Sequence, residues 1–368
     1  MADVDWSAWA ETSSPLVDQH DAVLLDLDGV VYVGEHAVPG AVAAIDLVRA
    51  RDVAVAFVTN NASRTPADVA AHLVRLGVTA AARDVVTSAQ AAAAMLRDLL
   101  DPGSAVLSIG ADGLAQALQE AGLRPVQSMD DEPQAVVQGF SPHLSWPMLL
   151  EACVAVRAGL PWVATNLDST LPTPRGTAPG NGAFVDVVRR TTGVEPQVAG
   201  KPYRPLMDAS VDRLRAQRAV VVGDRLDTDL AGARRAGLPG MLVLTGVTGV
   251  RALLAADPGE RPDYLAADLH GLLDAHQAPR RDAAAWMVPD GGQDGPLRAW
   301  IDDSEGLRLD GATPHPDGAD QQAALAVLRL ACAALWNGAG SHAAISADRV
   351  QQAFEAVRPW TSGPGWDR

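Results

Sequence analysis

Acidic side chains stand at the ends of apolar runs that have the character of buried strands. Asp26 and Asp28 lie at the end of the run at 22–27, and Asp224 lies at the end of the run at 219–224. In open α/β sheets, ligands bind outside the carboxyl ends of the strands. We therefore expect these three carboxylates to meet at one edge of a sheet.

Hydrogen-bond donors follow a third apolar run, at 53–59. Thr59, Asn60 and Asn61 end this run, and Lys201 is the one lysine among the 29 basic residues. Lys201 also opens the helix before the last of the three strands, so it belongs to the same sheet edge. Fixed donors stabilise negative charge that builds up in a transition state. This set predicts a pocket for the oxygens of a phosphoryl group.

Carboxylates at close quarters need a counter-charge, which a hard divalent cation with oxygen ligands supplies. We predict Mg²⁺, held at Asp26, Asp28 and Asp224. A carboxylate beside Mg²⁺ can attack phosphorus and form an aspartyl-phosphate. A second carboxylate two residues on can protonate the leaving oxygen and then activate water. The pattern predicts a phosphomonoesterase that acts on a small phosphorylated metabolite.

The elements that must position these residues alternate between strands and helices. Such alternation is typical of a parallel sheet covered by helices, so we predict an α/β, doubly wound core. Expected strands lie at 22–27, 53–59, 219–224 and 241–246, and expected helices at 38–51, 65–76 and 201–214.

A middle block repeats the strand and helix texture and separates the two flanks. We predict a discontinuous core domain at 1–84 and 194–277, with an inserted α/β cap domain at 85–193. Five of the nine tryptophans follow residue 277, where the character of the sequence changes. Residues 278–368 are therefore expected to form a small C-terminal α+β extension.

Composition excludes several classes of protein. The chain has 368 residues, 48% of them hydrophobic, and a formal net charge of −16, so nucleic-acid or membrane binding is not expected. Two cysteines provide no disulfide framework. The acidic N-terminus lacks the apolar segment of a signal peptide, and no apolar run reaches about 18 residues. These features predict a cytoplasmic protein.

Four short motifs give the chain a family resemblance. DLDGV at 26–30, TNN at 59–61, GKP at 200–202 and GDRLDTD at 223–229 resemble the motifs of the haloacid dehalogenase superfamily. The block between the second and third motifs resembles the large cap of its sugar-phosphate, phosphoglycolate and pyridoxal-phosphate phosphatases. With its extension, the whole chain resembles the glycerol-3-phosphate phosphatases of actinobacteria, which implies glycerol 3-phosphate as the substrate.

The resemblance also implies a role for each motif residue. Asp26 becomes the nucleophile and Asp28 the general acid and base. Mg²⁺ binds Asp26, the backbone carbonyl of Asp28, and Asp224, and Asp229 supports these ligands without binding the ion itself. The resemblance assigns the phosphate to Thr59, Asn60, Asn61 and Lys201.

The turn-rich segment at 164–183 resembles the substrate-specificity loop of these phosphatases. Asn166, Asp168, Leu171 and Arg175 are its candidates for contact with the substrate. Pyridoxal-phosphate phosphatases carry a histidine where Leu171 stands, which argues against that substrate. Phosphoglycolate phosphatase and broad-specificity sugar-phosphate or 4-nitrophenyl phosphatase remain alternatives, and a homo-oligomer formed through the cap is a further expectation.

Two interpretations from other classes remain open. A phospho-acceptor signalling domain also gathers Asp, Thr and Lys around Mg²⁺, but it needs no cap and no acid at Asp28. A scaffold protein would use its C-terminal extension to bind a partner and would need no intact pair of Asp26 and Asp28. A related enzyme, a phosphomutase, would transfer the phosphoryl group rather than release it.

Overall fold

The computed structural model describes residues 9–173, 175–282, 285–288, 297–302, 306–311, 321–338 and 345–361. Contacts divide the chain into two compact units. One unit consists of Met1–Val55 and Ala216–Arg368, and the other of Ala56–Arg215. The domain boundaries expected from the sequence follow the motifs rather than these contacts, and they stay a prediction.

Parallel strands form the sheet of the first unit, where their order is β15-β14-β13-β1. They span Ala22–Leu25 (β1), Ala219–Gly223 (β13), Gly240–Val243 (β14) and Tyr264–Ala266 (β15). The register of β1 on β13 runs from Ala22 opposite Ala219 to Leu25 opposite Val222. Every residue of these strands is buried, as continuous apolar runs in parallel sheets predict.

Short helices and turns connect these strands. Helix α1 (Ala41–Arg49) buries Ala41, Ala44, Ile45 and Val48, which recur at helical spacing. A small hairpin, β2 (Tyr32–Val33) and β3 (His36–Ala37), follows β1. The other elements are a π-helical turn (Leu226–Leu230), α8 (Ala231–Ala236), α9 (Val250–Leu254) and 3₁₀ turns at Leu16–Gln19, Pro258–Glu260 and Leu269–Leu273.

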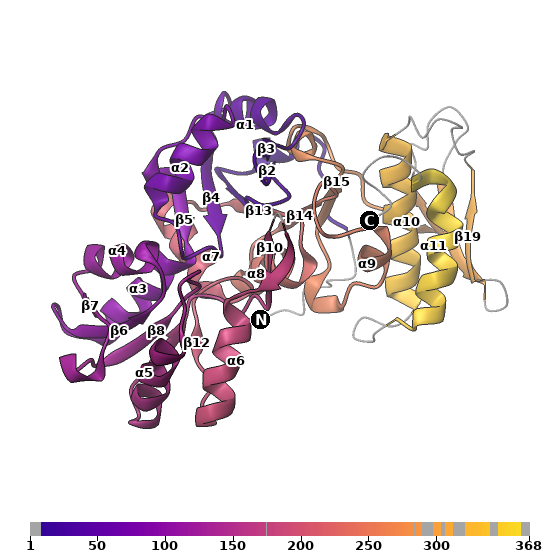
Figure 1. The fold of residues 1–368 in the computed structure, drawn as a ribbon. Helices are drawn as coiled ribbons and strands as arrows, with labels where there is room; N and C mark the ends of the chain where they lie inside the picture. Colours follow the sequence, from indigo (N-terminus) through magenta and orange to yellow (C-terminus); the bar gives the residue numbers. More distant parts are fainter. Residues whose placement is uncertain are drawn as a thin grey trace. The chain divides into compact units, whose positions relative to one another are not determined.

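The C-terminal extension is an antiparallel sheet with two helices packed against it (Figure 1). The sheet order is β16-β17-β18-β19. The elements are β16 (Arg280–Asp282), β17 (Ala285–Val288), β18 (Leu297–Asp302), β19 (Gly306–Asp310), α10 (Gln321–Gly338) and α11 (Ala347–Thr361). This arrangement confirms the expected α+β extension.

The extension shares a hydrophobic core with the strands of its unit. Trp336 of α10 is 1% exposed, and its ring stacks on Trp9 with centroids 5.2 Å apart. The Trp9 indole donates to the backbone carbonyl of Arg329 at 3.0 Å, and the Arg329 guanidinium donates to the carbonyl of Leu265 in β15 at 2.6 Å. Aromatic, apolar and polar contacts therefore join α10 to the parallel sheet of the first unit.

Strand β4 (Ala54–Thr59) enters the second unit at Ala56, and there its residues from Phe57 on pair in parallel with β5 (Val85–Thr87). The predicted start of the next helix is confirmed, because the Thr65 hydroxyl accepts from the Asp68 N–H at 3.1 Å and caps α2 (Pro66–Arg75). Helices α3 (Ser88–Leu99) and α7 (Arg204–Leu214) and a 3₁₀ turn at Ala82–Asp84 complete this part.

A separate parallel sheet, ordered β12-β9-β8-β6-β7, follows in the same unit. Its strands are β6 (Ala105–Ile109), β7 (Arg124–Val126), β8 (Ala135–Gln138), β9 (Trp162–Ala164) and β12 (Gln197–Val198). Its other elements are α4 (Asp112–Glu120), a 3₁₀ turn (Met129–Asp131), α5 (Trp146–Arg157) and α6 (Asn181–Thr192).

The predicted fold class is confirmed: the chain has a parallel α/β core, a second parallel α/β sheet and a small antiparallel extension. The segment at 164–183, expected as a loop, contains an antiparallel hairpin of β10 (Thr170–Thr173) and β11 (Gly176–Pro179). Within the described residues, no helix has both the length and the apolar character needed to cross a membrane.

Candidate active site

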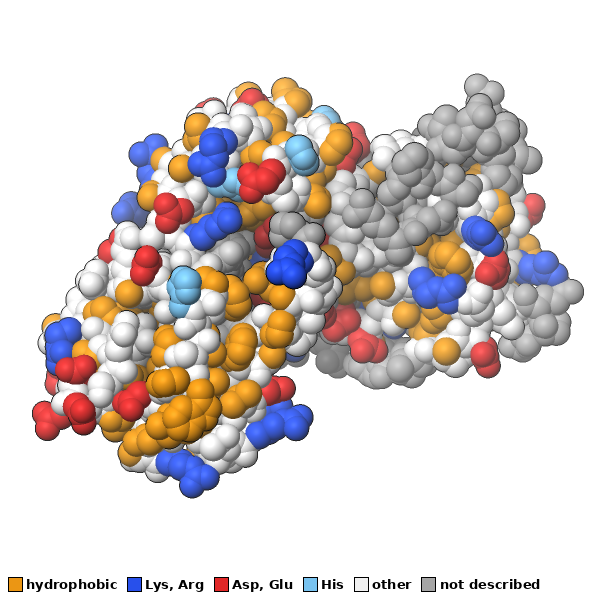
Figure 2. Space-filling model, in the orientation of Figure 1, with side chains coloured by type: hydrophobic (Ala, Val, Ile, Leu, Met, Phe, Trp, Pro, Cys, Tyr) orange, Lys and Arg blue, Asp and Glu red, His pale blue; other side chains and the backbone are white. Residues whose placement is uncertain are grey.

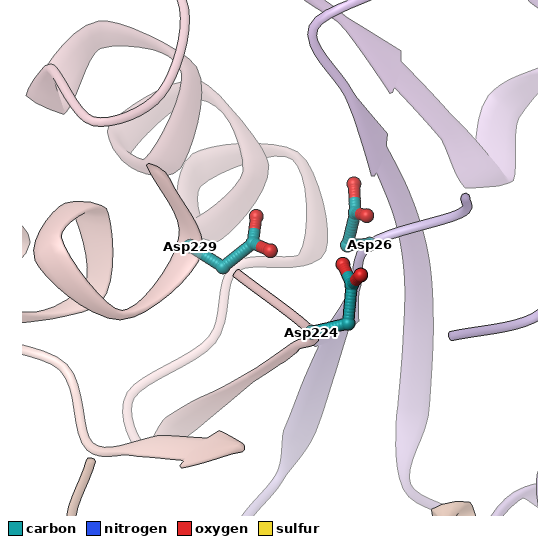
Figure 3. Close-up of side chains that lie close together, drawn as sticks. All are labelled: Asp26, Asp224 and Asp229. Carbon is teal, nitrogen blue, oxygen red and sulfur yellow. The ribbon is translucent and has the colours of Figure 1, made fainter. Parts of the chain in front are cut away.

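Three carboxylates converge in the first unit. Asp26 follows β1, Asp224 follows β13, and Asp229 lies in the π-helical turn after β13. Each offers an oxygen atom, and these atoms lie within 4.8 Å of one another (Figure 3). Asp224 and Asp229 are buried, whereas Asp26 is half-buried. The structure thus brings together the ends of two strands that the sequence analysis placed at one sheet edge.

Glycines make room for the Asp224 carboxylate. A Cβ atom added to Gly29 or Gly246 would overlap this carboxylate, so a side chain at either position would displace it. The Val247 N–H donates to Asp224 Oδ2 at 2.6 Å, and the Thr248 N–H donates to the Asp224 carbonyl at 3.1 Å. Charge-assisted bonds from a backbone N–H orient a carboxylate firmly. Asp224 is therefore fixed in place from both the main chain and the side chain.

Asp229 is oriented by its own helical turn. The Arg225 N–H donates to Asp229 Oδ2 at 3.1 Å, and the Asp229 N–H donates to the Arg225 carbonyl at 3.1 Å. Gly223 faces the Asp229 side chain, and a Cβ there would overlap it. The nearby Asp227 instead pairs with the Arg225 guanidinium at 2.8 Å and is largely exposed. Of these two acidic residues, only Asp229 joins the carboxylate group.

The carboxylate group fits a hard divalent cation. At an effective dielectric constant of 20, two like unit charges about 5 Å apart repel by roughly 3 kcal/mol. Three such pairs in a mostly buried setting favour a positive ion with oxygen ligands, and Mg²⁺ suits a few carboxylates together with waters and substrate oxygens. Asp28 is exposed, and its carboxylate is not in the group. The expected contribution of its backbone carbonyl stays a prediction.

Thr59, the last residue of β4, and Asn61 form a compact turn in the second unit. Thr59 is 5% exposed, and its hydroxyl accepts from the Asn61 N–H at 3.1 Å. The Asn61 side-chain oxygen accepts from both the N–H and the hydroxyl of Ser63, at 2.9 and 2.8 Å. These bonds fix the turn, so its backbone direction is set before any ligand binds.

Lys201 is buried in the same unit, with 3% of its surface exposed. Its ammonium group donates to the carbonyl of Val58 in β4 at 3.3 Å. Its own N–H donates to the Asn60 side-chain oxygen at 2.8 Å. A Cβ on Gly200 would lie 2.5 Å from that same oxygen, so glycine is needed for the close approach. Lys201 and the TNN segment are therefore joined directly.

Asn60 binds groups of the protein through its side chain. Its Nδ2 donates to the Lys201 carbonyl at 3.0 Å and to the two Asp168 carboxylate oxygens at 3.2 and 3.3 Å. The carboxamide thus binds protein groups with both its oxygen and its nitrogen. These side-chain bonds leave the backbone N–H of Asn60 as its possible donor to phosphate, and the phosphate-binding roles of Asn60 and the other residues stay predictions.

The cap segment places its four candidates in two settings. Asn166 and Asp168 precede the hairpin, and Asn166 Oδ1 accepts from the Asp168 N–H at 3.1 Å. Leu171 and Arg175 lie on the hairpin, where Leu171 is half-buried and Arg175 is exposed. Asn181 is not among the residues predicted from the sequence; it is 2% exposed and donates to the Asn166 carbonyl at 2.8 Å. Its position at the start of a helix after a glycine was the available signal.

Family models and related proteins match both flanks of the chain. A model described as haloacid dehalogenase-like hydrolase matches residues 23–124, and one described as HAD-hydrolase-like matches residues 198–272. The D-glycerol 3-phosphate phosphatase of Mycobacterium tuberculosis is 48% identical over 281 residues, which are 75% of this chain and 78% of that protein. An acid sugar phosphatase of Staphylococcus aureus is 37% identical over 232 residues, or 62% and 88% of the two chains.

Solved structures extend the similarity into the C-terminal extension. The crystal structure of glycerol phosphate phosphatase from Mycobacterium tuberculosis in complex with calcium has a TM-score of 0.79 and 39% identity, and covers 95% of this chain and 100% of that one. Its complex with magnesium has a TM-score of 0.77, also at 39% identity, and covers 94% and 98%.

The fold and the site define the class of the protein: it is a hydrolase with a parallel α/β core and a carboxylate metal site. The chain belongs to the haloacid dehalogenase-like hydrolases, as the resemblance of its four motifs implied.

Proposed function

We propose that this hydrolase is a metal-dependent phosphomonoesterase that releases phosphate from glycerol 3-phosphate. The observation that carries the proposal is the convergence of Asp26, Asp224 and Asp229, because a phosphate ester needs both a nucleophile and charge neutralisation. The similarity to a glycerol 3-phosphate phosphatase over three quarters of the chain supports the choice of substrate.

In the proposed reaction, a carboxylate oxygen of Asp26 attacks phosphorus, and the bond from phosphorus to the glycerol oxygen breaks. Asp28 donates a proton to that leaving oxygen. Asp28 then takes a proton from a water molecule, which attacks the aspartyl-phosphate and regenerates Asp26 with release of phosphate. The exposed position of Asp28 is compatible with proton exchange with water at each turnover.

Asp26, the backbone carbonyl of Asp28, and Asp224 would hold Mg²⁺, and Asp229 would support the site. When bound, the ion supplies positive charge that offsets the repulsion between the nucleophile and an anionic ester. Thr59, the backbone after it and Lys201 donate to the phosphoryl oxygens in this proposal. The bonds that fix the turn at Asn61 and the buried Lys201 support that role, because preorganised donors need no rearrangement during the reaction.

Release of inorganic phosphate from a panel of phosphomonoesters tests the proposal. Glycerol 3-phosphate, phosphoglycolate, several sugar phosphates and p-nitrophenyl phosphate are assayed with Mg²⁺, and kcat/KM is compared. We expect glycerol 3-phosphate to be the best substrate. A preference for phosphoglycolate or for sugar phosphates would replace it with one of those alternatives. A stable phosphorylated protein without turnover would favour a phospho-acceptor signalling domain.

A homo-oligomer formed through the cap is the proposed assembly. Apolar residues at a spacing of four on α5 are exposed: Trp146 by 72%, Leu150 by 42% and Val154 by 45%. Figure 2 shows the hydrophobic patch over this helix. The molar mass from light scattering tests the assembly, with Trp146→Glu as the variant. We expect a dimer that dissociates in the variant, and a monomeric wild type would exclude it. The cytoplasmic location remains a prediction.

A further inference from the structure

The hydrogen bonds of Asn60 join Lys201 to the base of the cap hairpin. Asn60 Oδ1 accepts from the Lys201 N–H at 2.8 Å, and Nδ2 donates to the Lys201 carbonyl at 3.0 Å. A carboxamide that binds both backbone groups of one residue acts as a neighbouring strand does. It fixes the backbone from which the buried ammonium extends.

The second hydrogen of the same Nδ2 goes to the cap. It is directed at the Asp168 carboxylate, with the two oxygens 3.2 and 3.3 Å from the nitrogen. One nitrogen therefore donates to Lys201 and to Asp168 at once. A displacement of Asp168 therefore displaces the Asn60 carboxamide, which fixes the Lys201 backbone, because both bonds are made by Asn60 Nδ2.

The Asn60 backbone is bound to the cap as well. Its carbonyl accepts from Asn166 Nδ2 at 2.7 Å and from the Ser88 hydroxyl at 2.6 Å. Asn60 thus meets the cap through Asn166 and Asp168, two residues apart. Both connections are made through bonds to a residue that is adjacent to Thr59.

The hairpin is anchored to these same cap residues. Asp168 and Asn166 precede β10, and Asn181 and Gly182 follow β11. Asn181 Nδ2 donates to the Asn166 carbonyl at 2.8 Å, and the Gly182 N–H donates to the Asp168 carbonyl at 2.9 Å. A Cβ on Gly182 would overlap the Leu167 carbonyl, so this base is tightly closed. Both ends of the hairpin are therefore hydrogen-bonded to Asn166 and Asp168, the residues that bind Asn60.

We propose that Asn60 and Asp168 are positioning residues that couple the cap hairpin to the ammonium group of Lys201. A substrate whose organic part contacts the hairpin then sets the position of a phosphate-binding group through Asp168 and Asn60. The hairpin discriminates between substrates through kcat as well as through KM. This inference rests on the proposed function for its consequence in catalysis, but the coupling itself is a property of the chain.

The single lysine of the chain allows the coupling to be measured without any reaction. Protein labelled with ¹⁵N-lysine gives one backbone amide signal, which belongs to Lys201. Asp168→Asn is expected to shift this signal, although Asp168 does not touch that N–H in the bonds described above. Asn337→Asp is the matched control, because the Asn337 amide donates only to the Ala333 carbonyl of its own helix among the bonds described, at 2.9 Å. An unmoved Lys201 signal in Asp168→Asn would overturn the coupling.

Kinetics of an exchange series measure the consequence. Asn60→Asp places a second carboxylate against Asp168 and removes the two N–H donors of the Asn60 carboxamide. If the Lys201 ammonium moves by about 1 Å as a result, kcat should fall on the order of 10²-fold. Asn60→Asp combined with Asp168→Asn restores a donor between the two positions, and it should recover at least ~10-fold of that loss.

Outcomes of the two experiments are distinct. A double variant no better than Asn60→Asp, at unchanged thermal stability, would contradict the positioning role. A wild type that hydrolyses none of the phosphomonoesters would refute the proposed function, and the Lys201 amide signal would still decide the coupling.

Discussion

Replacing Lys201 by arginine keeps the charge but changes the shape of the group. An ammonium is a compact point charge, whereas a guanidinium is planar, wider and suited to two parallel bonds. Lys201 is 3% exposed, and its backbone is held on both sides by the Asn60 carboxamide. The backbone cannot retreat to admit a larger head group, so the new group must shift away from the position of Nζ near the Val58 carbonyl.

The expected loss follows from that shift. A misplacement of about 1 Å at a reacting centre costs on the order of 10²-fold in rate, or about 2.7 kcal/mol of transition-state stabilisation. We therefore predict that Lys201→Arg lowers kcat about 10²-fold for glycerol 3-phosphate and for p-nitrophenyl phosphate alike. KM should change less, because the charge that attracts the phosphate is kept.

The assay is phosphate release by purified protein, with thermal unfolding measured in parallel. Arg204→Lys is the matched exchange in the opposite direction, on the exposed start of α7, where Arg204 pairs with Asp208 at 3.2 Å. It should leave kcat unchanged. If Lys201→Arg stays within about threefold of the wild type for both substrates, charge alone matters and the argument from shape is wrong.

Three further predictions concern the metal, the extension and acid. EDTA should abolish phosphate release, and added Mg²⁺ should restore it. Ca²⁺ should inhibit the reaction because its larger, looser coordination misplaces the phosphate. Full activity in the presence of the chelator would exclude a metal at Asp224. Trp336→Ala should lower the free energy of unfolding by about 3–5 kcal/mol in chemical denaturation, because a buried ring stacked on Trp9 is lost; a change below about 1 kcal/mol would contradict the shared core. Burial lowers the pKa of His276 to about 4. The unfolded chain therefore binds a proton at His276 more readily than the folded chain does. The free energy of unfolding should fall by up to about 3 kcal/mol as the pH drops from 6.5 to 4. In thermal unfolding, His276→Gln should lose less stability over this range than the wild type, and an unchanged pH dependence would contradict this account.

Buried strands were the most predictable part of the fold. The runs at 22–27, 53–59 and 219–224 are apolar and end in turn-forming or acidic residues, so their positions follow from composition alone. The hairpin of β10 and β11 could not be predicted in this way. Its residues are mostly exposed Thr, Pro and Gly, without the apolar alternation that marks a strand.

The extension shows a second limit of sequence patterns. Its long helix, Gln321–Gly338, is marked in the sequence by apolar residues that are dense and continuous. The packing of Trp336 on Trp9 joins residues more than 300 positions apart, and no local pattern announces such a contact.

In the site, strand-end carboxylates were predictable and side-chain partners were not. Asp26 and Asp224 meet because the ends of neighbouring parallel strands meet, which topology alone requires. The direction of the Asn60 carboxamide depends on Lys201 and Asp168, which lie 141 and 108 residues further along the chain. Spacing within the TNN motif contains no information about those partners.

The rate of phosphate release by Asp26→Asn tests the central claim most directly. The substitution keeps the shape of the side chain and removes its nucleophilic charge, so an aspartyl-phosphate cannot form. With glycerol 3-phosphate and Mg²⁺, and with thermal unfolding that shows a folded protein, we predict release at the background rate. Turnover by a folded Asp26→Asn protein at a rate near that of the wild type would contradict a mechanism through Asp26.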